Sequence, residues 1–385
     1  MQTETNFDIA FVGAGLAGLA GAIQCAKKGF KVLLIEKEAF PFHKVCGEYI
    51  SMESFDFLSS LGVPLSGLHL PLIKTLQISA PDGKRFTTRL PLGGFGISRY
   101  KLDALLADIA AQNNVVLLEK TKVEAIKHSG DGNHSIQLAT AAGERTEVKT
   151  RVCCCSYGKR SNLDVRWHRS FLDKKHPSIN NYVAVKYHIE TDWPEDLIGL
   201  HNFKNGYCGI SRIEEGKYCL CYLTRAENLK ANGNSIAQME KEVLFKNPVL
   251  KGIFEKSTIL YEAPLTISQI SFSRKTLVED GALMLGDAAG MITPLCGNGM
   301  SMALHSSKIA SHHIERYLQH KTGRAEMEAG YTKEWEETFK SRLATGRILQ
   351  GFFGSPLLSN LFVRSFKLMP FMAENIIRRT HGKPF

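Results

Sequence analysis

The N-terminal part of the chain alternates between apolar runs and a glycine-rich segment. Residues 9–12 and 32–35 are apolar runs of strand length, and residues 17–26 form a stretch of small residues with helical length. The segment Gly13-Ala14-Gly15-Leu16-Ala17-Gly18 connects the first run to this stretch. The order of strand, glycine turn, helix and strand predicts a βαβ unit of the dinucleotide-binding type.

The glycine turn has the composition that a bound pyrophosphate requires. Gly13 and Gly15 would leave backbone N–H groups accessible at a helix N-terminus, and Gly18 would let the helix pack closely on the strand. Glu36 follows the second apolar run, where a carboxylate can accept hydrogen bonds from ribose hydroxyls. The alternative is a tight turn in another doubly wound protein, and the unit alone does not distinguish FAD from NAD. Two neighbours complete the expected contacts, Ala17 and Lys37.

A second glycine-rich segment lies far downstream and favours a flavin. Residues 281–285 form an apolar strand that Gly286-Asp287 would end, and Gly297-Asn298-Gly299 would open a helix over residues 300–318. The carboxylate can bind ribityl hydroxyls, and the helix N-terminus can face the pyrimidine edge of an isoalloxazine. The expected cofactor contacts here are Asp287, Gly297, Gly299 and Met300.

The segment between these two regions has the pattern of antiparallel strands. Residues 73–91 form a predicted hairpin around Asp82-Gly83, and later stretches alternate apolar and polar positions. These stretches are residues 181–190, 206–224 and 265–273. Such a sheet would cover a flavin.

Taken in order, these motifs resemble the superfamily of FAD-dependent reductases and monooxygenases that includes aromatic hydroxylases, flavin halogenases and geranylgeranyl reductases. The resemblance also covers Arg99 in "FGISRYKLDALL", Val123 in "KTKVEAI", "CSYGKRSNL" and "GDAAGMITPLCGNG". It implies that Arg99 and a backbone group near Val123 contact FAD and that Asp287 holds the ribityl chain. One departure is that Ser156-Tyr157-Gly158 stands where the superfamily usually has Ala-Asp-Gly.

The resemblance implies an α/β fold, α+β overall. A glutathione-reductase-type Rossmann FAD domain is interleaved with an antiparallel β-sheet substrate domain and followed by C-terminal helices. We expect the FAD domain in residues 1–68, 96–160 and 274–325, the substrate domain in residues 69–95 and 161–273, and the helical segment in residues 326–385.

The stretch "KVCGEYIS" is similar to a Cys-Gly-Glu segment of archaeal geranylgeranyl reductases that lies against the flavin. The resemblance implies that Cys46 and Gly47 contact the isoalloxazine. Three roles for the thiol stay open: it donates a proton after hydride transfer, it only lines the cavity, or it pairs with Cys296. Glu48 is the alternative acid, with a solvated loop carboxylate or a salt-bridge partner as the simpler interpretation.

Two motifs bear on the substrate. Geranylgeranyl reductases carry Gly-Tyr-x-Trp-x-Phe-Pro along a lipid channel, and the matching place here reads Gly206-Tyr207-Cys208-Gly209-Ile210-Ser211. The match implies that Tyr207 lines the substrate cavity, although a strand aromatic can equally belong to the core. The three tryptophans are isolated, so the Trp-x-Trp-x-Ile-Pro signature of halogenases is missing and halogenation is not expected.

Composition and charge exclude several classes of protein. The 385 residues carry a formal net charge of +10 without a nucleic-acid-binding motif, so a basic surface for anionic cofactors or membrane is expected rather than nucleic acid. The nine cysteines lack metal-ligand spacing, no metal is expected, and Cys153-Cys154-Cys155 is predicted to be core. The sequence contains no signal-like segment that would predict export and no apolar run of about 18 residues that would predict a membrane span. A cytoplasmic protein is therefore expected.

The tail from residue 346 mixes Phe, Leu and Met with Arg and Lys, with breaks at Pro356 and Pro370. It is expected to cover a hydrophobic tunnel, to lie on anionic lipid, or to pack on the FAD domain. Peripheral membrane contact is therefore one expectation for this segment.

These features predict an FAD-dependent oxidoreductase that reduces a carbon–carbon double bond in an apolar, lipid-like or polyketide-like substrate. The alternatives are a monooxygenase acting on such a substrate and a flavin- or lipid-binding protein without turnover. No second glycine fingerprint follows a strand, so NAD(P)H is expected to bind transiently near the flavin, unless an electron-donor protein replaces it.

Overall fold

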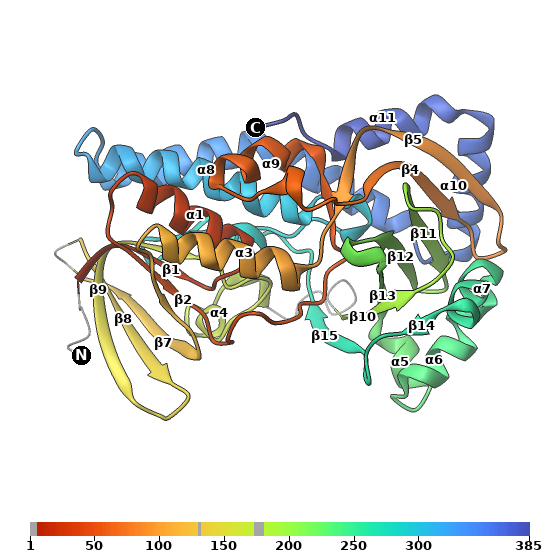
Figure 1. Ribbon diagram of the computed structural model, residues 1–385, viewed down its shortest axis with the longest axis horizontal. Helices are drawn as coiled ribbons and strands as arrows, with labels where there is room; N and C mark the ends of the chain where they lie inside the picture. The colour runs from red at the N-terminus through yellow and green to blue at the C-terminus, as the bar shows by residue number, and fades with distance from the viewer. Residues whose placement is uncertain (1–5, 130–131, 173–180) are drawn as a thin grey trace.

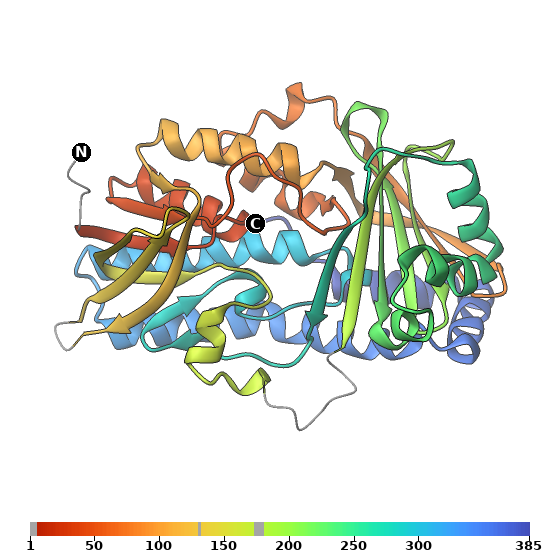
Figure 2. The same cartoon turned by 90° about the horizontal axis from the view of Figure 1, so that it is seen from below.

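The fold was analysed in a computed structural model that describes residues 6–129, 132–172 and 181–385. Two β-sheets lie side by side along the long axis of the molecule (Figure 1). Two long helices, α8 (Gly299–Leu318) and α9 (Arg324–Phe352), run along one side and extend from the first sheet toward the second (Figure 2). The described fold is the α/β, α+β overall arrangement that the sequence predicts.

The first sheet contains eight strands within the described residues, and its centre is parallel. The first strand, β1, pairs in parallel with β2 on one side and with β9 on the other, and β9 pairs in parallel with β17. The strands are β1 (Asn6–Val12), β2 (Val32–Ile35), β6 (Val116–Leu118), β7 (Thr121–His128), β8 (His134–Thr140), β9 (Arg145–Cys155), β16 (Val278–Glu279) and β17 (Ala282–Met284). The carboxyl ends of β1, β9 and β17 meet at one edge, which brings the loops that follow them together.

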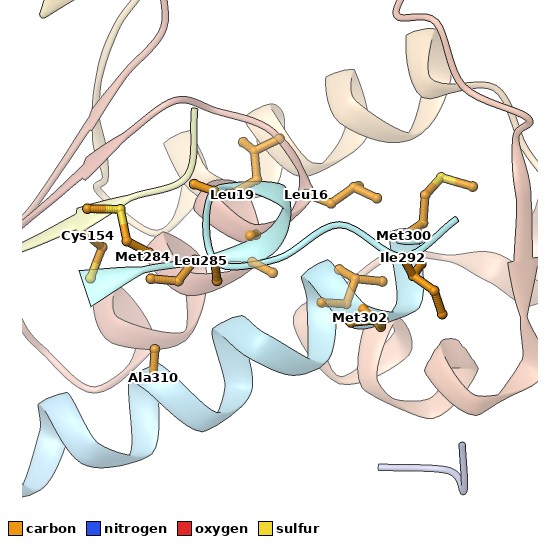
Figure 3. Packing of buried hydrophobic residues seen from close by; sticks show 14 of the residues in the cluster. Leu16, Leu19, Cys154, Met284, Leu285, Ile292, Met300, Met302 and Ala310 are labelled. Carbon is orange, nitrogen blue, oxygen red and sulfur yellow. The ribbon is translucent and has the colours of Figure 1, made fainter. Parts of the chain in front are cut away.

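Small side chains let α1 (Leu16–Lys27) lie between the sheet and α8. Figure 3 shows Leu16 and Leu19 of α1 above the segment that runs from Met284 to Met300, with Ala310 of α8 below it. The three cysteines at positions 153–155 are fully buried in β9, so the prediction that they belong to the core is confirmed. Further helices of this half are α2 (Phe55–Leu61), α3 (Arg99–Gln112) and α4 (Asn162–Arg166).

The second sheet contains nine strands within the described residues and is mostly antiparallel. The predicted hairpin around Asp82-Gly83 is confirmed, because Ser79 pairs with Arg85 across that turn. The strands are β3 (Tyr49–Ser51), β4 (Leu72–Ser79), β5 (Arg85–Gly96), β10 (Tyr182–Glu190), β11 (Leu197–Phe203), β12 (Gly206–Arg212), β13 (Tyr218–Arg225), β14 (Thr258–Ile259) and β15 (Leu265–Ile270). Alternation of side chains along these strands gives the sheet two faces.

A small hydrophobic cluster joins the second sheet to three short helices. These helices are α5 (Ala226–Ala231), α6 (Ile236–Glu242) and α7 (Pro248–Lys256). Tyr187 and Tyr222 both donate hydrogen bonds to Glu240 of α6 at 2.8 Å, which satisfies a buried carboxylate. This cluster fixes the outer face of β10 and β13.

The chain crosses between the two sheets several times. The short strand β3 falls inside the expected FAD segment 1–68, yet it pairs with β5 in the second sheet. Helix α4 falls inside the expected substrate segment 161–273, yet it packs against β7 of the first sheet. Sequence position alone therefore does not assign these two elements to a sheet.

The C-terminal helices begin at the two prolines that were expected to break the tail. They are α10 (Pro356–Leu368) and α11 (Pro370–Thr380), and proline at the first helical position fits because its missing N–H has no intrahelical acceptor there. No helix among the described residues is both long enough and apolar enough to cross a membrane.

We predict that Phe339→Ala lowers the free energy of unfolding by about 3–5 kcal/mol, because a fully buried ring leaves a cavity when it is removed. Phe339 packs edge-to-face on Trp335 at 5.2 Å and holds α9 on α8. Urea unfolding followed by circular dichroism measures the change. The exposed neighbour Lys340 gives the control Lys340→Ala, and equal effects of both substitutions would contradict this account of the core.

Candidate functional site

The glycine turn after β1 has the backbone geometry that its residues predict. Gly13 has φ +100°, and a Cβ there would lie 2.6 Å from the Cα of Tyr157. A Cβ on Gly18 would lie 2.1 Å from the carbonyl oxygen of Gly13. Around Gly15, the nearest side-chain atom to such a Cβ is the Arg99 guanidinium at 3.8 Å. The turn therefore combines close packing at two glycines with an open, positively charged side at the third.

Glu36 stands at the end of β2 and is held by backbone N–H groups. Its carboxylate accepts hydrogen bonds from Ala14 at 3.0 Å and from Lys37 at 2.9 Å. The Lys37 side chain is exposed and lies 3.7 Å from Glu38. The Thr121 N–H donates to the Glu36 carbonyl, which starts β7 beside this carboxylate.

Val123 and Ala17, two of the expected FAD contacts, are positioned by the strand or helix on which each lies. Val123 is buried on β7, two residues after Thr121, and its carbonyl accepts a hydrogen bond from Asn162 at 3.3 Å. Ala17 is buried in the first turn of α1, and its Cβ lies 3.3 Å from the position that a Cβ on Gly286 would take. Ala17 therefore lies where the two glycine-rich segments meet. Val123 lies on the strand that begins beside Glu36.

Arg99 opens α3 and points at the glycine turn. Its guanidinium makes two hydrogen bonds of 2.7 Å to Asp103, four residues on, and Asp103 also lies 3.0 Å from Lys44. Burial would raise the pKa of Asp103, but attraction to Arg99 and Lys44 outweighs burial and lowers it. The sequence interpretation missed Lys44, although its position beside the cysteine motif was a usable signal.

The departure Ser156-Tyr157-Gly158 has a structural counterpart. Ser156 donates a hydrogen bond of 2.6 Å to the Gly13 carbonyl, and the Tyr157 hydroxyl donates one of 2.5 Å to Asp164. Asp164 forms a buried ion pair of 2.8 Å with Arg169. The backbone of Tyr157 thus closes over the glycine turn. The carboxylate of Asp164, seven residues later, lies beside the hydroxyl of Tyr157, the residue that stands where the superfamily usually has aspartate.

Asp287 lies in the short 3₁₀ turn after β17, among basic groups. Among the described residues its half-buried carboxylate makes no hydrogen bond and no ion pair, and burial raises its pKa. Lys275 donates a 2.7 Å hydrogen bond to the Asp287 carbonyl, and burial lowers the pKa of Lys275 and of Lys159 to about 8. A carboxylate without a partner among the described residues can accept hydrogen bonds from the hydroxyl groups of a ligand.

The N-terminus of α8 is open. Gly297 has φ +68° and precedes the helix, which begins at Gly299 without a side-chain cap. The ring of Tyr49 lies 3.0 Å from the position of a Cβ on Gly297, and Met300 is buried in the first helical turn. The unpaired N–H groups of this helix end and its dipole favour a group that carries negative charge.

The Cys-Gly-Glu loop, residues 44–48, is attached to the second sheet. The carbonyl oxygen of Cys46 accepts a hydrogen bond from the Cys219 thiol at 3.2 Å, and that of Gly47 accepts one from Ser211 at 3.1 Å. The half-buried Cys46 is a free thiol, and burial raises its pKa against the opposing charge of Arg99. Cys46 is therefore protonated at neutral pH.

Glu48 is the centre of a buried polar network that the sequence did not reveal. It has φ +56° and no exposed surface, and it accepts hydrogen bonds from the Arg99 N–H at 2.8 Å and from Lys186 at 2.5 Å. Its other oxygen lies 2.6 Å from His188 Nε2. Burial would raise the pKa of Glu48, but the His188 hydrogen bond and the Lys186 charge lower it. The interpretation of Glu48 as a solvated carboxylate is wrong, and the salt-bridge interpretation is confirmed.

The Glu48 network contains three side chains that could bind a metal ion, but a neighbouring lysine argues against such a site. Metal-binding atoms of Glu48, His188 and Cys219 lie within 4.8 Å of one another. The Lys186 ammonium already contacts the carboxylate and is itself fully buried, so a divalent cation would meet a positive charge. Tyr261 and His43, 3.1 Å apart, cover the network from the outside.

Tyr207 lies on β12 and is buried beside Leu295 and Cys296, which places it next to the turn before α8. Its ring packs edge-to-face on Phe353 at 5.8 Å. Cys296 is a free, buried thiol that contacts Thr293 at 3.5 Å. No Cys46–Cys296 disulfide is formed, so that alternative is not found here.

The comparisons with known proteins agree with this geometry. Residues 8–43 match the FAD binding domain family. Digeranylgeranylglycerophospholipid reductase from Methanococcus vannielii is 24% identical over 351 residues, which are 87% of this chain and 83% of that protein. Conditioned medium factor receptor 1 from Dictyostelium discoideum is 25% identical over 80% of this chain. The match spans 63% of the receptor, less than two thirds of its length.

Solved structures show the same fold. A geranylgeranyl bacteriochlorophyll reductase-like protein from Thermoplasma acidophilum superposes with a TM-score of 0.78 and 20% identity over 94% of this chain and 91% of that one. The flavin-dependent brominase Bmp2 superposes with a TM-score of 0.79 and 18% identity over 98% and 93%. The chain is an FAD-dependent oxidoreductase with the fold of these flavoproteins.

The residues of this flavoprotein fit FAD on two observations besides the family match. The glycine turn would lose its close packing if Gly13 or Gly18 carried a Cβ, and Arg99 offers a cation beside Gly15. The Asp287 carboxylate, in the turn after β17 that packs against α8, has no partner among the described residues. Glu36 and Val123 would then lie on the adenosine side, and Asp287, Gly297, Gly299, Met300, Cys46 and Gly47 on the flavin side.

We predict that Asp287→Asn weakens FAD binding about 10- to 100-fold, because a hydrogen bond to a charged acceptor contributes about 1.5–3 kcal/mol. Flavin fluorescence titration of the apoprotein measures the dissociation constant. The stability of the apoprotein should not fall, since the carboxylate has no partner among the described residues. An unchanged dissociation constant would contradict the assigned role.

We predict that Lys186→Met lowers the free energy of unfolding by about 3–5 kcal/mol, because it leaves the buried Glu48 carboxylate without its cation. The double variant Glu48→Gln/Lys186→Met should recover part of this loss. Urea unfolding measures both. The control Lys251→Met breaks an exposed ion pair with Glu255 and should cost less than about 0.5 kcal/mol.

The same pair predicts a pH dependence. The pKa of Glu48 is below its ordinary 4.5, so the stability from the carboxylate is fully present above pH 4.5 and is lost as the pH falls through the lowered pKa. The wild type should therefore lose more stability below pH 4.5 than the Glu48→Gln/Lys186→Met variant. If the free energy of unfolding fell equally with pH in both proteins, the Glu48–Lys186 pair would not contribute to the stability of the wild type.

Proposed function

We propose that this FAD-dependent oxidoreductase reduces a carbon–carbon double bond of an apolar, lipid-like or polyketide-like substrate. The observation that carries the proposal is the position of the Cys46 thiol, which lies between the Arg99 side of the glycine turn and the second sheet. Names of relatives that are digeranylgeranylglycerophospholipid reductases support this class of reaction.

FAD held by Glu36, Arg99 and Asp287 would, once reduced, provide a hydride for such a substrate. The Sγ of Cys46 then gives its proton to the neighbouring carbon, so that the two new C–H bonds account for one hydride and one proton. Burial favours the thiol over the thiolate, and the charges of Arg99 and Lys186 offset part of this effect. Uptake of a proton from water restores the thiol.

The protein positions this acid by fixing the backbone around it. Carbonyls of Cys46 and Gly47 are bonded to β13 and β12, and Glu48 is bonded to β10 and to the first residue of α3. A thiol on a loop held at both ends can stay within reach of a reacting carbon. Tyr207 and Phe353 contribute an apolar wall on the side of the second sheet.

The electron donor is proposed to be NAD(P)H bound transiently, or an electron-donor protein. The half-buried Lys159 is a basic group near Asp287 that a phosphate could contact. A second candidate function is a monooxygenase, because the shared fold does not distinguish the two reactions. A probable FAD-dependent monooxygenase, pqsL from Pseudomonas aeruginosa, superposes with a TM-score of 0.69 and 15% identity.

We predict that Cys46→Ala lowers the turnover number about 100-fold or more, the range for loss of a positioned general acid. Turnover is measured anaerobically with dithionite-reduced enzyme and a phospholipid that carries geranylgeranyl chains, with the saturated product followed by mass spectrometry. The control Cys25→Ala removes a buried thiol on α1 that bonds Ser311 and should leave turnover unchanged. A Cys46→Ala enzyme with wild-type turnover would reduce the thiol to cavity lining.

The same substrate incubated with NADPH under labelled oxygen separates the two reactions. A reductase gives a product two hydrogens heavier in the presence or absence of oxygen. Incorporation of labelled oxygen into the product would overturn the proposal in favour of a monooxygenase.

A further inference from the structure

The outer face of α10 is apolar. Leu357, Leu361 and Leu368 are 84%, 63% and 82% exposed, and their spacing places them on one stripe of the helix. The opposite stripe, with Val363 and Phe366, is buried against the rest of the protein. A surface helix normally has one apolar stripe, which faces the core, so the second stripe on α10 needs a partner outside the chain.

The apolar surface continues onto the adjoining helices. Phe371 at the start of α11 is 62% exposed and Ile348 near the end of α9 is 66% exposed. Nine of the sixteen large apolar side chains that the described residues expose lie between positions 348 and 372: Ile348, Phe352, Leu357, Leu358, Leu361, Leu368, Met369, Phe371 and Met372. We call these nine residues the apolar end. Scattered exposed apolar residues are ordinary, but a cluster of this kind marks an interaction surface.

The segment that carries the apolar end is rich in positive charge. Residues 346–385 contain six basic side chains and a single acidic one, Glu374. All six basic side chains are exposed and form no ion pair with the described residues: Arg347, Arg364, Lys367, Arg378, Arg379 and Lys383. Arg364 lies within the leucine stripe, three residues after Leu361 and four before Leu368. Long basic side chains in this position can reach anionic groups while their stems stay on an apolar surface.

The positive charge of this segment distinguishes between two possible partners of the apolar end. A second copy of the chain would bring like charges together across the interface, which is unfavourable. An anionic bilayer offers acyl chains to the leucines and, nearer the water, phosphate groups to the arginines and lysines. No described helix could cross a membrane, so such a contact would be confined to the membrane surface.

We propose that α10 and α11 dock the protein on the surface of an anionic lipid bilayer, with the apolar end entering the boundary between headgroups and acyl chains. The two views place these helices at the end of the molecule that carries the second sheet, away from β1 and the glycine turn (Figures 1 and 2). The docked protein would keep its nucleotide-binding half in water.

The docking helices are also joined to the strands of the candidate site. The Asn205 N–H donates to the Gly354 carbonyl at 2.7 Å, and Ser359 of α10 donates to the Asn202 side chain at 3.4 Å. Phe353 contacts Tyr207. The bilayer surface would therefore lie next to the strands that hold the Tyr207 wall, where an apolar substrate could enter. The docking itself does not depend on the proposed reaction.

The test is flotation of the full-length, FAD-loaded protein with phosphatidylcholine vesicles that contain or lack phosphatidylglycerol. The wild type should float with phosphatidylglycerol vesicles, and binding should fall as salt concentration rises. The triple variant Leu357→Ser/Leu361→Ser/Leu368→Ser should bind at least about tenfold more weakly, because three apolar side chains no longer enter the bilayer. Arg364→Glu/Lys367→Glu should lose the preference for phosphatidylglycerol.

The matched control is Leu72→Ser, which changes a 51% exposed leucine of β4 outside the apolar end and should bind like the wild type. Circular dichroism and flavin content check that each variant is folded, since all substituted residues are exposed. A wild type that stays with the soluble fraction, or a triple variant that binds like the wild type, would overturn the proposal. Sedimentation that shows a dimer lost in the triple variant would assign the surface to a second copy instead.

Discussion

The arrangement of the candidate site depends on one buried ion pair, Glu48 with Lys186. Burying two charges is unfavourable unless each finds its partner and further hydrogen bonds, and here Arg99 and His188 bond Glu48 while the Lys44 carbonyl accepts from Lys186. The pair joins β10 of the second sheet to the loop that follows β2 of the first. It therefore sets the position of Cys46 relative to both halves of the protein.

The rest of the site follows from the packing of α1 against α8. The parallel pairing of β1 and β17 with β9 brings the turns after β1 and β17 to the same edge of the sheet, although most of the chain separates them, and the contact of α1 with α8 holds the two turns together. Such an edge is where open α/β sheets bind their ligands. A long dinucleotide can contact both turns, and the Cys-Gly-Glu loop then lies between the cofactor and the second sheet.

Local patterns in the sequence predicted the parts of the fold that local physics controls. The glycine turn, the hairpin at Asp82-Gly83 and the breaks at Pro356 and Pro370 depend on neighbouring residues, and the structure has each of them. The partners of Glu48 could not be found in this way, because Lys186 is 138 residues distant and reads as an ordinary strand position. The leucines of α10 likewise resemble core residues until the fold leaves them exposed. The cofactor contacts and the role of Cys46 stay predictions.

The central claim is that the Glu48–Lys186 pair holds the Cys-Gly-Glu loop on the second sheet. Hydrogen exchange with mass spectrometry of the wild type and of Lys186→Met tests it directly, because it reports local opening of residues 44–51 separately from the rest of the chain. The account predicts faster exchange in this peptide and in β10, with α1 and α8 unchanged. Unchanged exchange of residues 44–51 in the variant would show that other contacts hold the loop and would contradict the account.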